Sequence, residues 1–92
     1  MSESEEDGWR RFLELCHNSD NLKELDALLH AVLTHTERHE IAFRVLIFRD
    51  LIREEKTQRE IARDLPISLA IVSRGSNVLK TLDPELRRKL VS

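Results

Sequence analysis

Apolar residues recur at helical spacing along most of the chain. Between residues 8 and 17 one apolar face is formed by Trp9, Phe12, Leu13 and Cys16, at i, i+3, i+4 and i+7. We expect Trp9 and Cys16 to pack in the core. The same spacing predicts a second helix over residues 22–32, after a turn at residues 18–21. No stretch of the sequence alternates as a strand would, so an all-α fold of six short helices is predicted.

The longest predicted helix runs from about His35 to Arg53 and is apolar around much of its circumference. Such a helix is buried on several sides, and a second subunit could supply that cover. The chain needs such cover, because proteins this short bury only about 60% of their unfolded surface. Arg44 lies in this apolar stretch. It either binds an anionic or aromatic partner or forms a surface ion pair with Glu40, and the pattern leaves both open.

Residues 57–80 are predicted to form a helix-turn-helix. Thr57 and Glu60 have the spacing of a capping box, so a short helix follows them. Pro66 ends that helix because proline lacks an N–H group, and Ser68 is a suitable N-cap for the next one. Two short helices joined by about three residues are typical of a unit whose second helix enters the DNA major groove. An ordinary corner of a helical bundle has the same pattern.

Gly75 lies inside the second helix of this predicted unit. A glycine within a helix costs roughly 1 kcal/mol relative to alanine. Its presence predicts that another group approaches the backbone closely at this position. Nearby residues between Ser73 and Lys80 offer hydroxyl, guanidinium, amide and ammonium groups, which favour a binding role for the helix.

Charge is spread unevenly over the 92 residues, whose formal net charge is −2. Residues 57–92 carry seven Lys/Arg and four Asp/Glu, a net of +3, whereas residues 1–56 carry eight and thirteen, a net of −5. This asymmetry fits a basic DNA-binding half on an acidic body, although a solvated charge run explains it almost as well. We expect a single domain over residues 1–92 that begins with an acidic arm, residues 1–7, which is loose at its start.

Several classes of protein are disfavoured by the sequence. Its single cysteine permits no internal disulfide, which fits a reducing cytoplasm, and it shows neither a signal peptide nor an apolar run approaching 18 residues. We therefore expect a cytoplasmic protein with no membrane association. Catalytic motifs are absent, so no enzyme activity or cofactor is expected. His35 and His39 have chelating spacing, but no further ligand completes a metal site.

Four segments together resemble the tryptophan repressor family. They are LTHTER (residues 33–38), the Arg44-Val45 pair, TQREIA (residues 57–62) and RGSNVLK (residues 74–80). The resemblance covers roughly residues 9–90. It implies an intertwined homodimer that represses transcription by binding double-stranded operator DNA when L-tryptophan, the corepressor, is bound. Two alternatives stay open: a regulator of the same fold that does not respond to tryptophan, and a helical protein-interaction module that does not bind DNA.

The resemblance also implies roles for individual residues. Arg44 and Arg74 would sandwich the indole ring, and Thr34 would lie near the carboxylate. The ligand-binding set implied in this way is Ala31, Leu33, Thr34, Arg44, Arg74, Gly75 and Val78. The backbone carbonyls of the first two would come from the other subunit and accept from the ammonium group. The implied DNA-binding set is Gln58, Arg59, Ser68, Leu69, Ala70, Ile71, Ser73, Asn77 and Lys80, with Arg59 as a direct guanine contact.

The sequence departs from the family pattern at four positions. Val78 replaces a serine that would bond the ligand's ammonium group, and Ile71 replaces a threonine at the base-reading tip. Ala62 replaces a lysine near the DNA. Pro66 stands where helix-turn-helix units prefer a glycine with positive φ, which we expect a proline not to adopt. These differences bear on ligand affinity and operator sequence more than on the fold.

Overall fold

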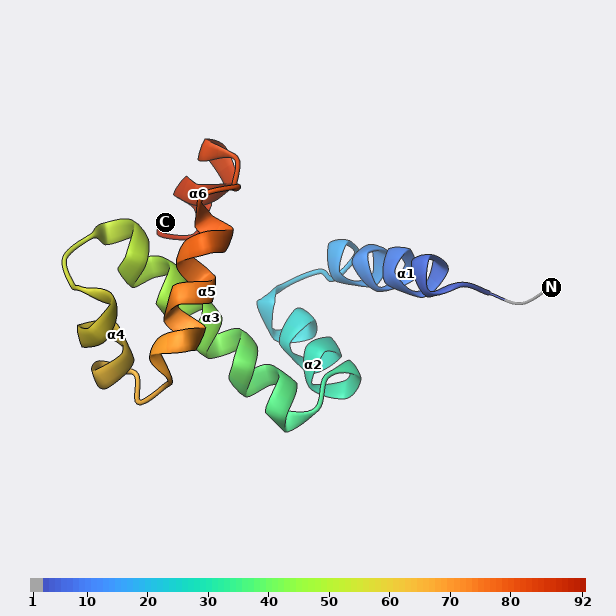
Figure 1. Cartoon of the computed structure of the whole chain (residues 1–92). Helices are drawn as coiled ribbons and strands as arrows, with labels where there is room; N and C mark the ends of the chain where they lie inside the picture. Colours follow the sequence, from blue (N-terminus) through green and yellow to red (C-terminus); the bar gives the residue numbers. More distant parts are fainter. Residues whose placement is uncertain (1–2) are drawn as a thin grey trace. The chain divides into compact units, whose positions relative to one another are not determined.

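The computed structural model describes residues 3–92, which form six α-helices (Figure 1). The helices are α1 (Glu5–His17), α2 (Leu22–Val32), α3 (His35–Arg53), α4 (Gln58–Asp64), α5 (Leu69–Leu79) and α6 (Pro84–Lys89). Residues 3–92 contain no strand. The predicted all-α class with six helices is therefore confirmed. The chain divides into two compact units, Met1–Arg38 and His39–Ser92. The assignment of residues 1–92 to one domain stays a prediction.

Helix α1 begins earlier than the sequence pattern predicted. The N–H group of Asp7 donates to the Ser4 hydroxyl at 3.2 Å, and the Ser4 N–H group donates to the Asp7 carboxylate at 3.0 Å. This capping box places three acidic residues in the first turn, where the positive end of the helix dipole favours them. The predicted helix start at about residue 8 is therefore wrong by three residues, and residues 5–7 of the acidic arm are helical. Residues 1 and 2 of that arm lie outside the described residues.

The apolar faces of α1 and α2 are largely uncovered within one chain. Neither helix has a fully buried residue, and Trp9 is 61% exposed. Its indole packs on Phe12 of the same helix, with 5.4 Å between ring centroids. Cys16 is half-buried. The prediction of core packing is therefore wrong for Trp9 within the single chain, because most of its side chain stays exposed.

The second unit has a hydrophobic core where α3, α4 and α5 meet. Ile47 of α3, Ile61 of α4 and Val72 of α5 are buried there. Each isoleucine or valine removed from water contributes about 1.5–3 kcal/mol to folding. The small side chain of Ala62 packs against this cluster. In Figure 1, α5 crosses α3 and α4 lies beside them.

Local capping interactions fix the start of the helix-turn-helix. The Glu60 N–H group donates to the Thr57 hydroxyl at 3.2 Å, and the Thr57 N–H group donates back to the Glu60 carboxylate at 3.0 Å. Ser68 caps α5 by accepting from the Ile71 N–H group at 3.2 Å.

Pro66 has a φ of 22°, so the expectation that it would avoid positive φ is wrong. The proline ring favours φ near −65°, and the turn is therefore strained.

Glu54 offers a direct test of backbone strain at the end of α3. It follows the last helical residue, Arg53, and has a φ of 55°, in the left-handed region. A side chain in that region costs roughly 1–2 kcal/mol, whereas glycine adopts it freely. Glu54→Gly should raise the free energy of unfolding by about 1 kcal/mol in urea titration. Glu55→Gly removes the same charge at a residue without positive φ and should not stabilise the protein. Equal effects of the two substitutions would contradict the assignment of strain to Glu54.

A second prediction concerns acid stability. The pKa values of Asp7, Glu37 and Glu60 are lowered by hydrogen bonds from the residue three positions earlier. The backbone N–H group of that residue has the larger effect, and its hydroxyl group has the smaller one. Their ordinary values are 3.8 for Asp and 4.5 for Glu. Because the folded pKa lies below the unfolded one, the stabilisation is present at neutral pH and is lost as pH falls through the folded pKa.

We therefore expect the free energy of unfolding to fall as the pH is lowered from about 5 to about 3. Glu60→Gln keeps an oxygen acceptor for the cap but cannot titrate, so it should make this pH dependence shallower. Glu55→Gln, which removes a carboxylate outside any capping box, serves as the control. The measurement is urea unfolding at a series of pH values. An unchanged pH dependence in Glu60→Gln would contradict the prediction.

Candidate functional site

A cavity of about 590 Å³ lies between α3 and α5 in the second unit. We refer to it as the α3–α5 cavity. Its apolar wall is formed by Phe43, Ile47, Phe48, Ile67, Ile71 and Val78. Its charged or titratable lining consists of His39, Glu40, Arg44 and Arg74. A concave, mostly apolar space with a few converging polar groups is the usual form of a small-molecule site.

Gly75 of α5 brings the two helices close together at this cavity. A Cβ atom placed on it would lie 3.1 Å from Cγ2 of Ile47 and 3.5 Å from Cδ1 of Leu51. The close approach that the sequence predicted at this glycine is therefore present, and the approaching group is a side chain of α3. Because Gly75 has no side chain, it contributes only backbone atoms to the cavity wall.

Two arginines from different helices line the same cavity. Arg74 comes from α5, and Arg44 comes from α3, where its Nη2 atom lies 3.9 Å from Oε2 of Glu40. The surface ion pair that the sequence left open is thus observed, and Arg44 still lines the cavity. The side chains of Arg44 and Glu40 are 63% and 54% exposed, so their pairing is weak. A guanidinium group can bind a carboxylate and also stack on an aromatic ring.

The structure brings together four of the seven predicted ligand-binding residues. Arg44, Arg74, Gly75 and Val78 all line the α3–α5 cavity. The other three, Ala31, Leu33 and Thr34, belong to the first unit and do not line it. The hydroxyl group of Thr34 accepts from the Glu37 N–H group at 3.1 Å, and the Leu33 carbonyl accepts from Nη1 of Arg38 at 2.8 Å. The ligand roles of all seven residues stay predictions.

Sequence reasoning did not identify six further residues of the cavity wall as part of a site. They are His39, Glu40, Phe43, Ile47, Phe48 and Ile67. Helical spacing from Arg44 could have found two of them, since residues 40, 44 and 48 lie on one face of a helix. Ile71 was predicted to face DNA, and it lines the cavity as well. The position of Ile67 depends on the turn before α5, and no local pattern predicts it.

The predicted DNA-binding residues lie on α4, on α5 and at their ends. Seven of them are exposed: Arg59, Ser68, Leu69, Ala70, Ile71, Asn77 and Lys80. The other two, Gln58 and Ser73, are half-buried and bond each other. The Ser73 hydroxyl donates to Oε1 of Gln58 at 2.9 Å, which joins the start of α4 to the middle of α5. The Gln58 carbonyl oxygen is thereby engaged, while its NH₂ group can still donate to another partner.

Asp50 of α3 is a buried carboxyl residue that the sequence pattern did not indicate. It is 6% exposed, and its Oδ1 atom accepts from Arg49, at 3.0 Å from both Nε and Nη2. Its Oδ2 atom has no hydrogen-bond partner within the part of the chain that the structure describes. Neighbours at i and i+1 normally point to different sides of a helix, so this pairing was not readable from spacing. Asp50 does not line the α3–α5 cavity.

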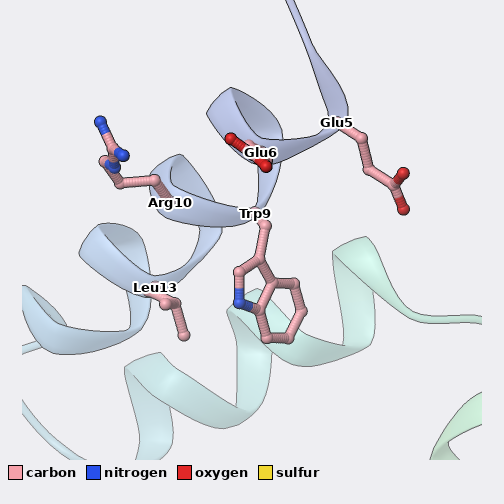
Figure 2. Close-up of a pocket in the computed structure, with 5 residues that line it drawn as sticks. All are labelled: Glu5, Glu6, Trp9, Arg10 and Leu13. Atoms are coloured by element: carbon pink, nitrogen blue, oxygen red, sulfur yellow. The ribbon is translucent and has the colours of Figure 1, made fainter.

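A second hollow, of about 430 Å³, lies on α1 (Figure 2). Its lining residues are Glu5, Glu6, Trp9, Arg10 and Leu13, all from that one helix. Figure 2 shows the indole of Trp9 and the side chain of Leu13 on one side of the helix. This hollow lacks converging polar groups from separate elements, so it is a weaker candidate for a small-molecule site than the α3–α5 cavity.

Among residues 3–92, no group of three or more His, Cys, Asp or Glu side chains is arranged to hold a metal ion. None of the helices described here is long and apolar enough to cross a membrane.

Known proteins resemble this chain over nearly its whole length. Residues 7–92 match the family described as Trp repressor protein. The Trp operon repressor homolog of Chlamydia trachomatis serovar D is 43% identical over 90 residues, which cover 98% of this chain and 96% of that protein. The homolog from Chlamydia caviae is 42% identical over 88 residues, covering 96% and 87%. The homolog from Vibrio vulnificus strain YJ016 is 35% identical over 82 residues, covering 89% and 80%.

These matches agree with the fold and with the resemblance seen in the sequence. The family match begins in the first turn of α1 and extends through α6 to residue 92, so it includes the helix-turn-helix and every residue that lines the α3–α5 cavity. The relatives share at least 35% of their residues with this chain over four-fifths or more of either protein. The chain therefore belongs to the Trp repressor family, a family of transcriptional repressors.

Proposed function

We propose that this protein represses transcription by binding operator DNA when L-tryptophan, its corepressor, occupies the α3–α5 cavity. The observation that carries the proposal is the position of this cavity against α5, the second helix of the helix-turn-helix. L-tryptophan presents a carboxylate and a flat indole ring, and arginine side chains can bind both groups. Arg44 and Arg74 supply guanidinium groups from two helices, and the apolar wall of the cavity suits the indole ring.

The proposed ligand would touch α3 and α5 at the same time. Arg44 and Phe48 belong to α3, whereas Arg74 and Val78 belong to α5, and all four line the cavity. A molecule held by both helices stabilises one distance and one tilt between them. Because α5 would carry the base-reading residues, such a ligand favours the orientation that fits the major groove.

The proposed DNA surface combines base-reading and phosphate-binding groups. Arg59 on α4 is exposed, and a guanidinium group can make the bidentate contact that reads guanine. Residues 68–71 form the start of α5, which is the part of a recognition helix that meets base edges. Asn77 and Lys80 are exposed near the end of α5 and suit phosphate contacts. A regulator of this kind works where DNA is accessible, so we also propose a cytoplasmic location.

We propose further that the protein is a homodimer. Trp9 and Leu22 of the first unit, and Ile41 and Val45 of α3, are exposed in the single chain. Isolated exposed apolar residues are ordinary, but apolar faces on three successive helices indicate an interface. A second copy of the chain offers the same faces, as two-fold symmetry requires.

The first test is ligand-dependent DNA binding. Duplexes would be selected from a random pool in the presence of L-tryptophan, and their affinity would then be measured with and without it. We expect L-tryptophan to release or absorb heat on binding and to tighten the DNA complex by tenfold or more, about 1.4 kcal/mol. Arg74→Ala should lose the ligand response, because Arg74 lines the cavity from α5. The variant should still fold, since this side chain is exposed and contributes little to the core. Equal DNA affinity with and without L-tryptophan would favour a regulator of the same fold that acts constitutively.

Arg59→Ala should weaken binding to the selected duplex by about 1–3 kcal/mol, the range for one bidentate arginine–guanine contact. Its effect on an unrelated duplex should be much smaller, because non-specific binding relies on phosphate contacts. Arg63→Ala is the matched control: this exposed arginine of α4 pairs with Asp64. Fluorescence anisotropy at fixed salt concentration measures both duplexes. Equal losses on the two duplexes would show that Arg59 contacts phosphate only.

Sedimentation equilibrium at micromolar concentration should give the mass of a dimer. Trp9→Ser should weaken the dimer, since it removes a large apolar ring that is exposed in one chain. Arg11→Ser is the control, and it should leave the dimer intact. Arg11 lies about half a turn from Trp9 around the same helix, where it forms a surface ion pair with Glu14. A folded monomer of the wild-type protein at this concentration would refute the proposed homodimer.

A further inference from the structure

Glu40 is the only acidic residue among the described residues that line the α3–α5 cavity. It lies one helical turn before Arg44, and its Oε2 atom is 3.9 Å from the Arg44 Nη2 atom. The cavity wall therefore presents a negative and a positive group side by side. Neither is held in place by burial, because the two side chains are 54% and 63% exposed.

This pair of charges is complementary to one class of small molecule. An α-amino acid carries its carboxylate and its ammonium group on the same carbon atom. If Arg44 binds the carboxylate, the neighbouring Glu40 is placed to accept from the ammonium group. The exposed pair between Glu40 and Arg44 is weak, so its replacement by contacts with such a ligand loses little.

The other groups on the wall are less suited to an ammonium group. Val78 has no polar atom, and Arg74 can only donate hydrogen bonds. His39 can accept through a ring nitrogen when it is neutral, but it carries no negative charge. Its ring also lies against Phe43, with 4.6 Å between ring centroids. Glu40 is the side chain of the wall that combines hydrogen-bond acceptance with a negative charge.

We propose that Glu40 binds the ammonium group of the ligand and makes the cavity selective for an aromatic amino acid over the same molecule without its amino group. The proposal rests on the proposed function, since it concerns the same cavity and ligand class. It assigns Glu40 as a specificity-determining residue. The Glu40 carboxylate lies beside Arg44, close to the place where the ligand's charged end would lie.

Three ligands separate the contributions of the two charged groups. L-tryptophan has both groups, tryptamine has only the ammonium group, and indole-3-propionate has only the carboxylate. Calorimetry would compare the wild-type protein with Glu40→Gln. The substitution should weaken L-tryptophan and tryptamine by about fivefold, the change that corresponds to about 1 kcal/mol for a partly exposed charge pair. Indole-3-propionate should bind equally well or more tightly, because a negative charge beside Arg44 is removed.

Two further variants control this experiment. Glu40→Asp keeps the charge on a shorter side chain and should retain part of the preference for L-tryptophan over indole-3-propionate. Glu55→Gln makes the same charge change at a residue that does not line the cavity, and it should leave all three affinities unchanged. Circular dichroism would verify that each variant keeps its helix content, which we expect because Glu40 is largely exposed.

The possible outcomes distinguish this inference from the proposed function. If the wild-type protein binds L-tryptophan but Glu40→Gln leaves the ratio of L-tryptophan to indole-3-propionate affinity unchanged, the inference alone is overturned. Tighter binding of all three ligands by Glu40→Gln would also overturn it, since Glu40 would then act only as a competitor for Arg44. If the wild-type protein binds none of the three, the proposed function and the inference both fail.

Discussion

The close packing of Gly75 against Ile47 determines the arrangement of the second unit. A Cβ atom at residue 75 would lie 3.1 Å from the Ile47 side chain, so even alanine would force a neighbour to move. The glycine lets α5 lie near α3, which places Val72 and Ile61 beside Ile47 in the core. Glycine in a helix costs about 1 kcal/mol, and the packing gained through the close approach offsets that cost. The same glycine also lines the cavity between the two helices.

The two units differ in how much of their apolar surface is buried within one chain. The second unit buries apolar side chains from three helices, whereas α1 and α2 bury none completely. A helix with an uncovered apolar face is marginally stable in water, because helix stability in proteins comes mainly from packing of that face. The helices of the first unit are therefore expected to depend on contacts from outside the chain more than α4 and α5 do. The most exposed apolar residues accordingly lie on α1 and α2, whereas α5 contributes Val72 to the core of the second unit.

Sequence patterns were most informative where the structure is determined locally. The capping box at Thr57 and the N-cap at Ser68 depend on groups within three residues of each other, and both were predicted. Ser4 and Asp7 have the same spacing, and the acidic run around them was misread as an arm. The burial of Asp50 depends on how α3 is rotated against the rest of the second unit, so no local pattern contains it. Periodicity on α3 could place Glu40 beside Arg44, but only the packing of α5 on α3 shows that both line a cavity with Arg74.

The hydrogen bond between Ser73 and Gln58 has a mechanical consequence for the helix-turn-helix. It joins α4 to α5 at a half-buried position, in addition to the apolar contacts around Ile61. Because of this connection we expect the two short helices to move together when α5 shifts against α3. A small displacement of α5 near Arg74 would then swing Arg59 on α4 as well. In the proposed function, binding of a ligand in the cavity would thus affect the base contact of Arg59 through the joint movement of α4 and α5, although Arg59 does not line the cavity.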